Sequence, residues 1–392
     1  MAASTDNTTT KTLQRIRSFR YVLVLEGIAV GVFAGIIVVL FRIALEKADG
    51  LLHAALAFGR ANPWFIPLWF GLLLAMAAAV TLLVRYEPMI GGSGIPQVEG
   101  EMQGRIQQCW WRVLAAKFAG GVLSIGAGLS LGREGPSIQL GAMAGKGFAR
   151  VTRRVKTEEK LLLTCGASAG LSAAFNAPFA GVLFSLEEVH KNFSAEVLLS
   201  TMASSITADF ISRNIFGLKP VFDFHIKSMM PLQHYGLVIV LGLILGLLGA
   251  VYILCIEKSQ QLYDRVRPAY CKTVIPFVLA GILGFTWPAL LGGGHSLVEQ
   301  LSGGDMALGL LGGLFAAKFL FSMLSFGAGV PGGIFLPLLV LGAVVGGAFS
   351  VSATSLFGVS ADLLQNFMIL GMAGYFSVIV RAPITGVILI AR

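Results

Sequence analysis

Gly-Arg-Glu-Gly-Pro-Ser, residues 132–137, is the stretch that decides the fold, because it places Arg133 and Glu134 inside a long apolar region. Charged residues at membrane depth are costly and are usually retained for function. Pro136 suits the first turn of a helix, and the segment after it runs for about fourteen residues before a basic cluster begins. At 1.5 Å per residue this segment covers roughly 21 Å, too short for a hydrocarbon core of about 30 Å. We therefore expect a half-helix that begins near mid-membrane.

The composition of the whole chain agrees with a membrane protein. Of its 392 residues, 56% are hydrophobic and 12% are charged, whereas soluble domains carry about 25% charged residues. Apolar runs such as 22–45 and 67–84 approach the ~20 residues that a spanning helix needs. The formal charge of +9 does not indicate nucleic-acid binding, because the basic residues flank the apolar runs. The scattered cysteines have no metal-ligand spacing, so we expect no metal and no cofactor.

Basic residues also predict the orientation in the membrane. Residues 1–20 carry four of them before the first span, so we place this segment in the cytoplasm. The apolar run that follows is too long for a secretory signal and has no small-residue cleavage site. We expect a multi-pass protein of the cell inner (plasma) membrane, with a short outer loop at 46–60 between its first two spans.

An internal repeat organises the chain. Residues 115–145 align without a gap with residues 316–346, and nearly half of these positions are identical. Low-complexity apolar sequence would hardly give such a match in one register by chance. The matched residues include Lys117 with Lys318, Gly132 with Gly333, and Pro136 with Pro337. The two lysines are expected to share a packing role or to snorkel toward the membrane surface.

The two repeats are expected to cross the membrane in opposite directions. The first repeat opens from a basic flank, whereas the first span of the second repeat ends before a basic cluster. Inverted repeats with Gly/Pro-broken helices are typical of secondary transporters, whose site lies at the repeat interface near the midplane. We therefore predict an all-α polytopic membrane protein of two inverted repeats. Its expected parts are a cytoplasmic segment at 1–20, repeats at 21–214 and 231–392, and an inter-repeat loop at 215–230.

Three glycine-rich turns before short apolar segments predict an anion site. They lie at residues 91–96, 132–137 and 332–337. Glycine leaves backbone N–H groups uncovered, and a helix N-terminus carries a partial positive charge, so such turns bind anions. Partial charges and a hydroxyl such as that of Ser93 hold an anion more weakly than a fixed cation does, as transport requires. The alternative for any one turn is an ordinary connection between packed helices.

Glu134 stands at a repeat position where the second repeat has Phe335. An ionised carboxylate at helix N-termini competes with an anion, and a protonated one loses that attraction and swings away. Glu134 is therefore predicted to link proton and anion occupancy. The alternative is a static ion pair with Arg133. Glu187 and Glu188 end a predicted helix at the cytoplasmic boundary, where a solvated helix end is the simplest interpretation for at least one of them.

These residues resemble the CLC family of chloride channels and chloride/proton antiporters. Residues 92–96, 132–136 and 333–337 are similar to its GSGIP, GREGP and GIFxP motifs, and the resemblance covers nearly the whole chain. It implies that Glu134 is the external gate and proton acceptor and that Glu188 is the inner proton-transfer residue. It also implies an anion-binding set, which comprises Ser93, Gly94, Arg133, Gly135, Ile334 and Phe335.

The resemblance implies chloride transport, coupled as chloride/proton antiport. Chloride and protons are then transported ions rather than cofactors, and the bilayer and a second copy in a homodimer are the expected partners. Ser93 favours chloride over nitrate, and the ordinary GREGP context argues against the fluoride-exporting branch. The alternatives are a passive voltage- or pH-gated chloride channel of the same fold and a non-transporting member. An enzyme has no support, since the sequence carries no HExxH, nucleophile elbow or P-loop.

Two departures from the family pattern bear on the site. Leu336 stands where the family often has alanine. The apolar run after Pro383 is about ten residues, too short to cross, so we expect a C-terminally truncated member. In the family a further helix supplies a tyrosine hydroxyl to the central anion, and no residue of this chain is assigned that role.

Overall fold

The computed structural model describes residues 3–191, 193–218, 222, 224, 226, 228–303 and 307–390, with side chains from Tyr21 onward. Within these residues the chain is helical and contains no strand. Seven of the described helices are long and apolar enough to cross a membrane. They are Tyr21–Ala61, Phe65–Tyr86, Leu232–Arg265, Ala269–Thr286, Leu308–Gly327, Phe335–Phe357 and Ala361–Val380. The prediction of an all-α polytopic membrane protein is confirmed.

The order of helices in the first half of the chain recurs in the second half. The first half contains α1 (Ala3–Ala61), α2 (Phe65–Tyr86), α3 (Ile95–Met102), α4 (Trp110–Gly126), α5 (Glu134–Val151), α6 (Lys156–Phe175), α7 (Pro178–Phe184) and α8 (Ala195–Phe216). The second half contains α9 (Tyr235–Arg265), α10 (Ala269–Thr286), α11 (His295–Ser302), α12 (Leu308–Gly327), α13 (Phe335–Phe357), α14 (Leu364–Val380) and α15 (Pro383–Ile390). Thus α1–α7 correspond in order to α9–α15.

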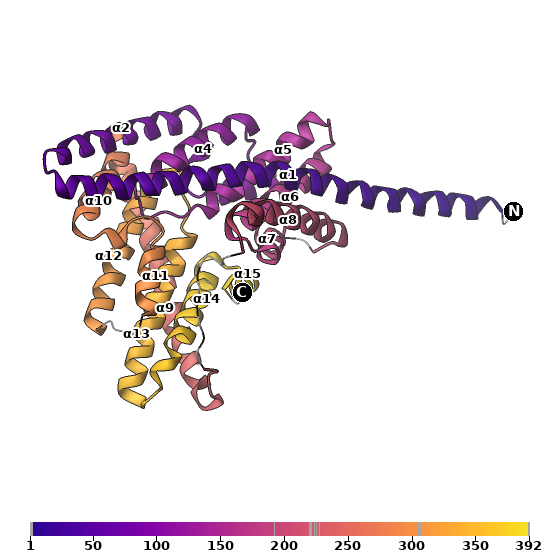
Figure 1. The fold of residues 1–392 in the computed structure, drawn as a ribbon. Coiled ribbons are helices and arrows are strands. Elements are labelled where there is room, and N and C mark those ends of the chain that lie inside the picture. The colour runs from indigo at the N-terminus through magenta and orange to yellow at the C-terminus, as the bar shows by residue number, and fades with distance from the viewer. Residues whose placement is uncertain are drawn as a thin grey trace.

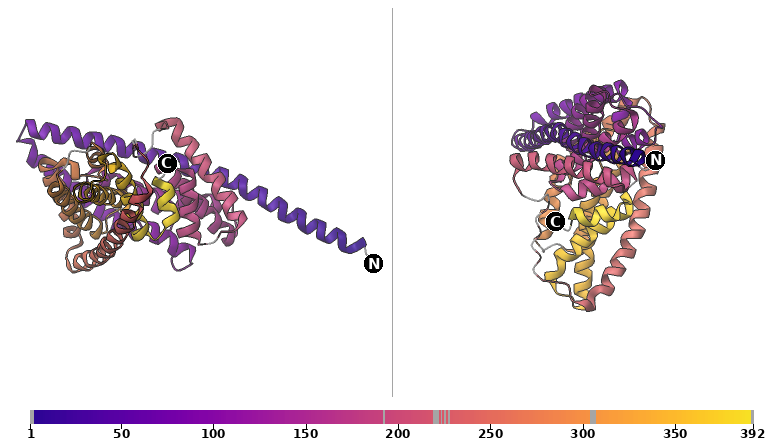
Figure 2. Two further views of the ribbon diagram at one scale, coloured as in Figure 1. Left: turned by 90° about the horizontal axis from the view of Figure 1, so that it is seen from below. Right: turned by 90° about the vertical axis from the view of Figure 1, so that its right-hand side faces the viewer.

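The predicted repeat boundaries stay predictions, although the helix order follows them. Residues 1, 2, 391 and 392 lie outside the described residues, as do several positions of the predicted loop at 215–230. In Figure 1 the helices of the first half fill the upper part of the view, α10 lies at the left beside α2, and α9 and α11–α14 fill the lower part. Figure 2 shows that the N-terminal part of α1 projects beyond the other helices.

The predicted outer loop at 46–60 was wrong, because α1 continues as a helix to Ala61. The charged residues Glu46, Lys47 and Asp49 lie exposed on this helix instead of interrupting it. The segment after them is rich in leucine and alanine, which are strong helix formers. The helix ends just before Asn62-Pro63, where the residue before a proline disfavours helical geometry.

Close backbone packing positions the half-helices. A side chain on Gly141 of α5 would collide with the carbonyl oxygen of Gly166 on α6, and a side chain on Gly166 would collide with Gly141. Gly342 and Gly371 repeat this contact between α13 and α14. Glycine therefore lets α5 and α13 lie directly against α6 and α14, as small residues do between membrane helices.

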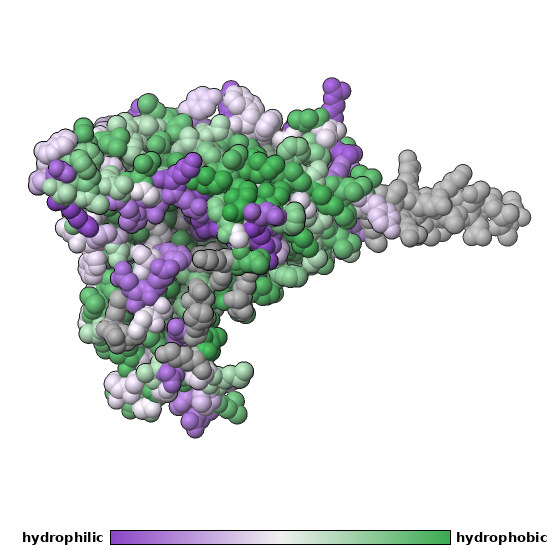
Figure 3. Space-filling model, viewed as in Figure 1, coloured by the Kyte–Doolittle hydropathy of each residue, from purple (hydrophilic) through white to green (hydrophobic). Residues whose placement is uncertain are grey.

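The outer surface of the bundle is apolar, as a bilayer requires. Large apolar side chains such as Phe33 and Leu40 on α1, and Phe210 on α8, are more than half exposed. Figure 3 shows a broad hydrophobic area over the first-half helices on the face in view. Glu134, Lys117 and Lys318, described below, are buried instead.

Candidate functional site

The glycine-rich turns of the two repeats meet at the centre of the molecule. Gly132 and Gly333 form an isolated antiparallel bridge, in which each N–H donates to the carbonyl oxygen of the other at 2.7 Å. These glycines are equivalent positions of the repeat, so a local twofold axis passes between them. The N–H of Gly332 also donates to the carbonyl oxygen of Gly92 at 3.0 Å. This bond brings the first of the three turns to the same place.

The N-cap residues of the helices at this junction do not cap them with their side chains. Helices α3, α5 and α13 begin after Gly94, Arg133 and Ile334, and no side chain of these three residues makes a capping hydrogen bond. Gly94 has φ of +93°, in the left-handed region that glycine adopts readily. Uncapped N–H groups and the positive end of the helix dipole favour an anion.

Ser93 lies against the first turn of α5. A side chain on Gly135 would come within 3.0 Å of the Ser93 Cβ, so only glycine lets the two backbones approach this closely. The Ser93 hydroxyl oxygen accepts from the Ile95 N–H at 3.3 Å, which leaves its proton free to donate elsewhere. The structure thus brings together Ser93, Gly94 and Gly135, with Gly333 beside them.

Glu134 is buried at the same junction, with a side chain that is 1% exposed. Its carboxylate lies beside Gly132, and the backbone N–H groups of Glu134 and Leu336 are directed toward it. Its Oε2 atom has no hydrogen-bond partner among the described residues. A buried carboxylate oxygen without a partner is costly, so this group is suited to changing its protonation or its position.

Arg133 does not form the static ion pair that was the alternative for Glu134. Within the described chain no salt bridge joins the two side chains, and the Arg133 Nε atom is buried without a hydrogen-bond partner. The guanidinium acts on the Glu134 carboxylate only through longer-range charge attraction.

Phe335, the repeat counterpart of Glu134, lies in an aromatic cluster. Its ring meets Phe184 at 5.6 Å and Phe376 at 4.8 Å between ring centroids, in both cases edge to face. Such pairs stabilise a fixed ring position. The side chain of Phe335 is therefore anchored, while Ile334 and Phe335 present their backbone N–H groups at the start of α13.

Glu188 lies in a second cluster of charged groups just after α7, in the short π-helix η2 (Ser185–His190). The charges that act on it come from Glu99, Lys191, Glu187 and Arg381. Lys191 pairs with Glu99 at 3.0 Å, and this hydrogen bond raises the pKa of Lys191. The structure does not bring Glu188 into contact with Glu134.

Glu187 is not a solvated helix end, although its neighbour is partly exposed. Its carboxylate accepts hydrogen bonds from the backbone N–H groups of Ile384 and Thr385, at 3.4 Å and 3.1 Å, and from the Thr385 hydroxyl at 2.9 Å. Glu187 therefore caps α15 from the other repeat. The proline that starts α15 signals a helix N-terminus that needs an acceptor, but the sequence does not show which acidic residue reaches it.

The two repeat lysines do not snorkel. Lys117 and Lys318 are both 0% exposed, and each Nζ atom donates to two backbone carbonyl oxygens. Ile90 and Leu290 end short 3-10 helices, and Gly92 and Gly292 lie in the turns after them, so these carbonyl groups are available to the lysines. Sequence reasoning missed this contact, since it depends on how helices far apart in sequence pack together.

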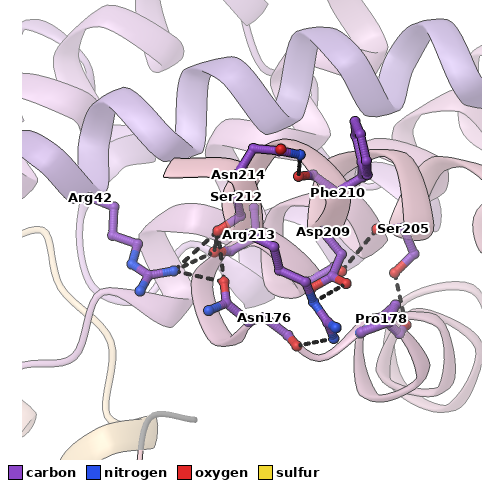
Figure 4. A network of polar contacts seen from close by, with 11 residues as sticks. Arg42, Asn176, Pro178, Ser205, Asp209, Phe210, Ser212, Arg213 and Asn214 are labelled. Atoms are coloured by element: carbon purple, nitrogen blue, oxygen red, sulfur yellow. Dashed lines mark hydrogen bonds and ion pairs between the residues drawn. The ribbon is translucent and has the colours of Figure 1, made fainter. Parts of the chain in front are cut away.

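A polar network holds the break between α6 and α7 and was also missed (Figure 4). Arg42 of α1 donates to the Ala173 carbonyl, the Asn176 side-chain oxygen and the Ser212 hydroxyl at 2.9–3.1 Å. Arg213 of α8 donates to the Asn176 carbonyl at 3.2 Å. The network fixes the residue at which the chain turns into α7, the segment that leads to Glu188.

Comparisons with known proteins agree with this arrangement. A family model described as voltage gated chloride channel matches residues 74–392. The chain is 34% identical over 389 residues to the H(+)/Cl(-) exchange transporter ClcA of Klebsiella pneumoniae strain 342, covering 96% of this chain and 82% of the relative. It is 35% identical over 378 residues to ClcA of Salmonella arizonae, covering 94% and 80%.

Solved structures show the same fold. The structure of a slow cyanobacterial Cl-/H+ antiporter superposes with a TM-score of 0.89 at 29% identity, covering 94% of this chain and 88% of that one. A CLC-type fluoride/proton antiporter superposes with a TM-score of 0.75 at 23% identity, covering 95% of this chain and 94% of that one. At this identity the likeness shows a shared fold only. The names of the ClcA relatives describe transporters, in agreement with the expectation that the chain is not an enzyme.

Proposed function

The chain belongs to the voltage-gated chloride channel family, the CLC family, and on that premise we propose that it exchanges chloride for protons across a membrane. The names of the ClcA relatives and of the cyanobacterial antiporter support coupled exchange over passive conduction. The observation that carries the proposal is the buried Glu134 carboxylate at the junction of uncapped helix N-termini.

Chloride binds where the turns leave hydrogen-bond donors free. The donors are the Ser93 hydroxyl and the backbone N–H groups of Ile334 and Phe335, with Gly94, Arg133 and Gly135 shaping the turns around them. Partial charges replace water around the ion without holding it as tightly as a fixed ammonium or guanidinium group in direct contact. Weak binding of this kind permits release on the other side.

Glu134 alternates with the anion. When it is ionised, its carboxylate is attracted by the positive ends of the helix dipoles and accepts from the backbone N–H groups of Glu134 and Leu336, as it does in this structure. When a proton neutralises it, that attraction is lost and chloride replaces it. Proton uptake and chloride entry are thereby linked at one side chain.

Glu188 passes protons between the cytoplasm and the site. Its position at the end of α7, among Glu99, Lys191 and Arg381, gives it neighbours of both charge signs in a half-buried setting. Glu187 caps α15 beside this region.

The finer points of location and assembly belong to the same proposal. The basic residues before the first span support a cytoplasmic N-terminus. The protein is assigned to the cell inner membrane as a homodimer, with one pathway in each subunit. Exposed apolar side chains on α8 and α15, including Phe210 and Val387, offer a surface for the second copy.

Reconstitution into liposomes tests the proposal directly. A chloride gradient is imposed, and chloride flux and internal pH are recorded together. Uphill proton movement driven by chloride is the expected result. Chloride flux without proton movement would replace antiport by a passive channel, and the absence of any flux from a folded protein would remove both.

A further inference from the structure

Lys117 of α4 is bound to the turn that carries Ser93. Its Nζ atom donates to the carbonyl oxygens of Ile90 at 2.8 Å and Gly92 at 2.7 Å, inside a fully buried site. A buried amine is costly unless its protons are taken up by acceptors. The two short bonds therefore make Lys117 a structural part of this turn.

Lys318 makes the same contact in the second repeat. Its Nζ atom donates to the carbonyl oxygens of Leu290 at 2.8 Å and Gly292 at 2.7 Å, and it is also fully buried. The same geometry recurs in two turns whose side chains differ. A lysine tied to two carbonyl groups is therefore part of the scaffold common to both repeats.

The bonds from Lys117 decide which way the peptide before Ser93 faces. In a trans peptide the carbonyl group and the N–H group point in opposite directions. Because Lys117 binds the Gly92 carbonyl, the Ser93 N–H is directed away from the lysine. The same carbonyl oxygen also accepts from the Gly332 N–H at 3.0 Å, so it accepts two hydrogen bonds.

We propose that Lys117 is a positioning residue for the anion site. It holds the carbonyl groups of the turn on the lysine side and leaves the Ser93 hydroxyl and amide free for a small monovalent anion. The inference rests on the proposed function, because it concerns the same chloride site. Lys117 acts through the turn and does not itself touch the ion.

The second repeat supplies the matched control. Gly293 stands in place of Ser93 and offers no hydroxyl, and the Leu336 side chain occupies the space into which a Gly293 side chain would extend. Lys318 therefore orients a turn that has no room for an anion beside it. Its loss changes stability without changing chloride binding.

Chloride titration of Lys117→Met and Lys318→Met tests the inference. Methionine keeps an unbranched side chain and removes the amine donors. The purified proteins are checked for a single folded species, and chloride binding is measured by calorimetry in detergent. We expect Lys117→Met to raise the Kd for chloride by about tenfold or more, because an oriented turn is lost. Lys318→Met is expected to stay within about twofold of the wild type, with a similar loss of thermal stability.

Equal changes in chloride Kd for the two variants, or an unchanged Kd for folded Lys117→Met, would overturn the inference. A wild-type protein that binds no chloride would instead remove the proposed function, and with it the premise. If the methionine variants do not fold, Lys117→Arg and Lys318→Arg give the same contrast. The larger planar guanidinium displaces the turn, so only Lys117→Arg is expected to weaken chloride binding, and equal effects again overturn the inference.

Discussion

The two repeats share the same backbone arrangement but carry side chains of different size and polarity at equivalent positions. Beside Ser93 the neighbouring helix has Gly135, which leaves room, whereas beside Gly293 the neighbouring helix has Leu336, which fills that room. The position proposed as the gate shows the same contrast, with Glu134 in one repeat and Phe335 in the other. In the proposed function, a symmetric scaffold carries a site on one side only, and a few side-chain differences decide which side.

One pair of backbone contacts recurs in both repeats. The Gly92 N–H donates to the Gly329 carbonyl, and the Gly292 N–H donates to the Gly128 carbonyl. Substitutions that affect one repeat only are therefore the sharpest test of what each side chain adds.

Removing the Glu134 carboxylate is expected to have the largest effect. Glu134→Ala should abolish uphill proton movement and spare chloride flux, because the one carboxylate in the first turns of α3, α5 and α13 is lost. Parallel chloride and pH recordings in liposomes measure this. Glu134→Gln, which imitates the protonated side chain, should behave in the same way, and coupling that persists in either variant would contradict the assignment.

Glu188→Ala should also lose proton coupling, with chloride flux retained. The charged neighbours of Glu188 then have no carboxylate through which a proton can pass toward the interior. The ratio of chloride to proton flux is the quantity to measure. Glu187→Ala serves as the control, because the capping role of Glu187 predicts a retained ratio. An unchanged ratio in Glu188→Ala would show that Glu188 is only a solvated residue at a helix end.

Leu336→Ala should make the second repeat more like the first. It empties the space beside Gly293 and next to the Glu134 carboxylate, so we expect chloride flux to rise severalfold with coupling intact. Stopped-flow or electrode recording of chloride release checks the rate. Ile334→Val, two positions earlier, removes one methylene group as a control. A flux that falls or stays constant in Leu336→Ala would show that Leu336 does not restrict the site.

Glu187→Gln is expected to have the smallest effect. The neutral amide still accepts a hydrogen bond at the N-terminus of α15 but loses its charge, so stability should fall by about 1 kcal/mol. Thermal unfolding in detergent measures the shift. Glu188→Gln, which leaves the cap intact, should unfold at close to the wild-type temperature, and an equal shift in both would argue against capping.

The sequence was sufficient to locate the starts of the half-helices. Residues 132–137 and 332–337 carry local signals, glycine for the turn and proline for the first helical turn, and these do not depend on the rest of the fold. The uncapped N-termini of α5 and α13 begin where these signals predict.

Contacts between distant elements could not be predicted in the same way. Glu187 caps a helix almost 200 positions further along the chain. Lys117 binds carbonyl groups of a distant turn, and the sequence pattern of its own helix does not predict that contact. The extension of α1 past Glu46 was missed for another reason. Charged residues were taken to end a span, although helix propensity and solvent exposure allow the helix to continue.

The bridge between Gly132 and Gly333 has a consequence for how the protein can move. Its two hydrogen bonds join the repeats through backbone alone, and each is worth about 4–6 kcal/mol in an apolar medium. Rocking one repeat against the other would break both in every transport cycle, whereas a side chain such as that of Glu134 rotates about its own single bonds without disturbing them. We therefore expect the two repeats to keep their relative position during transport. In the proposed exchange, the Glu134 side chain rotates while the backbone around it stays fixed.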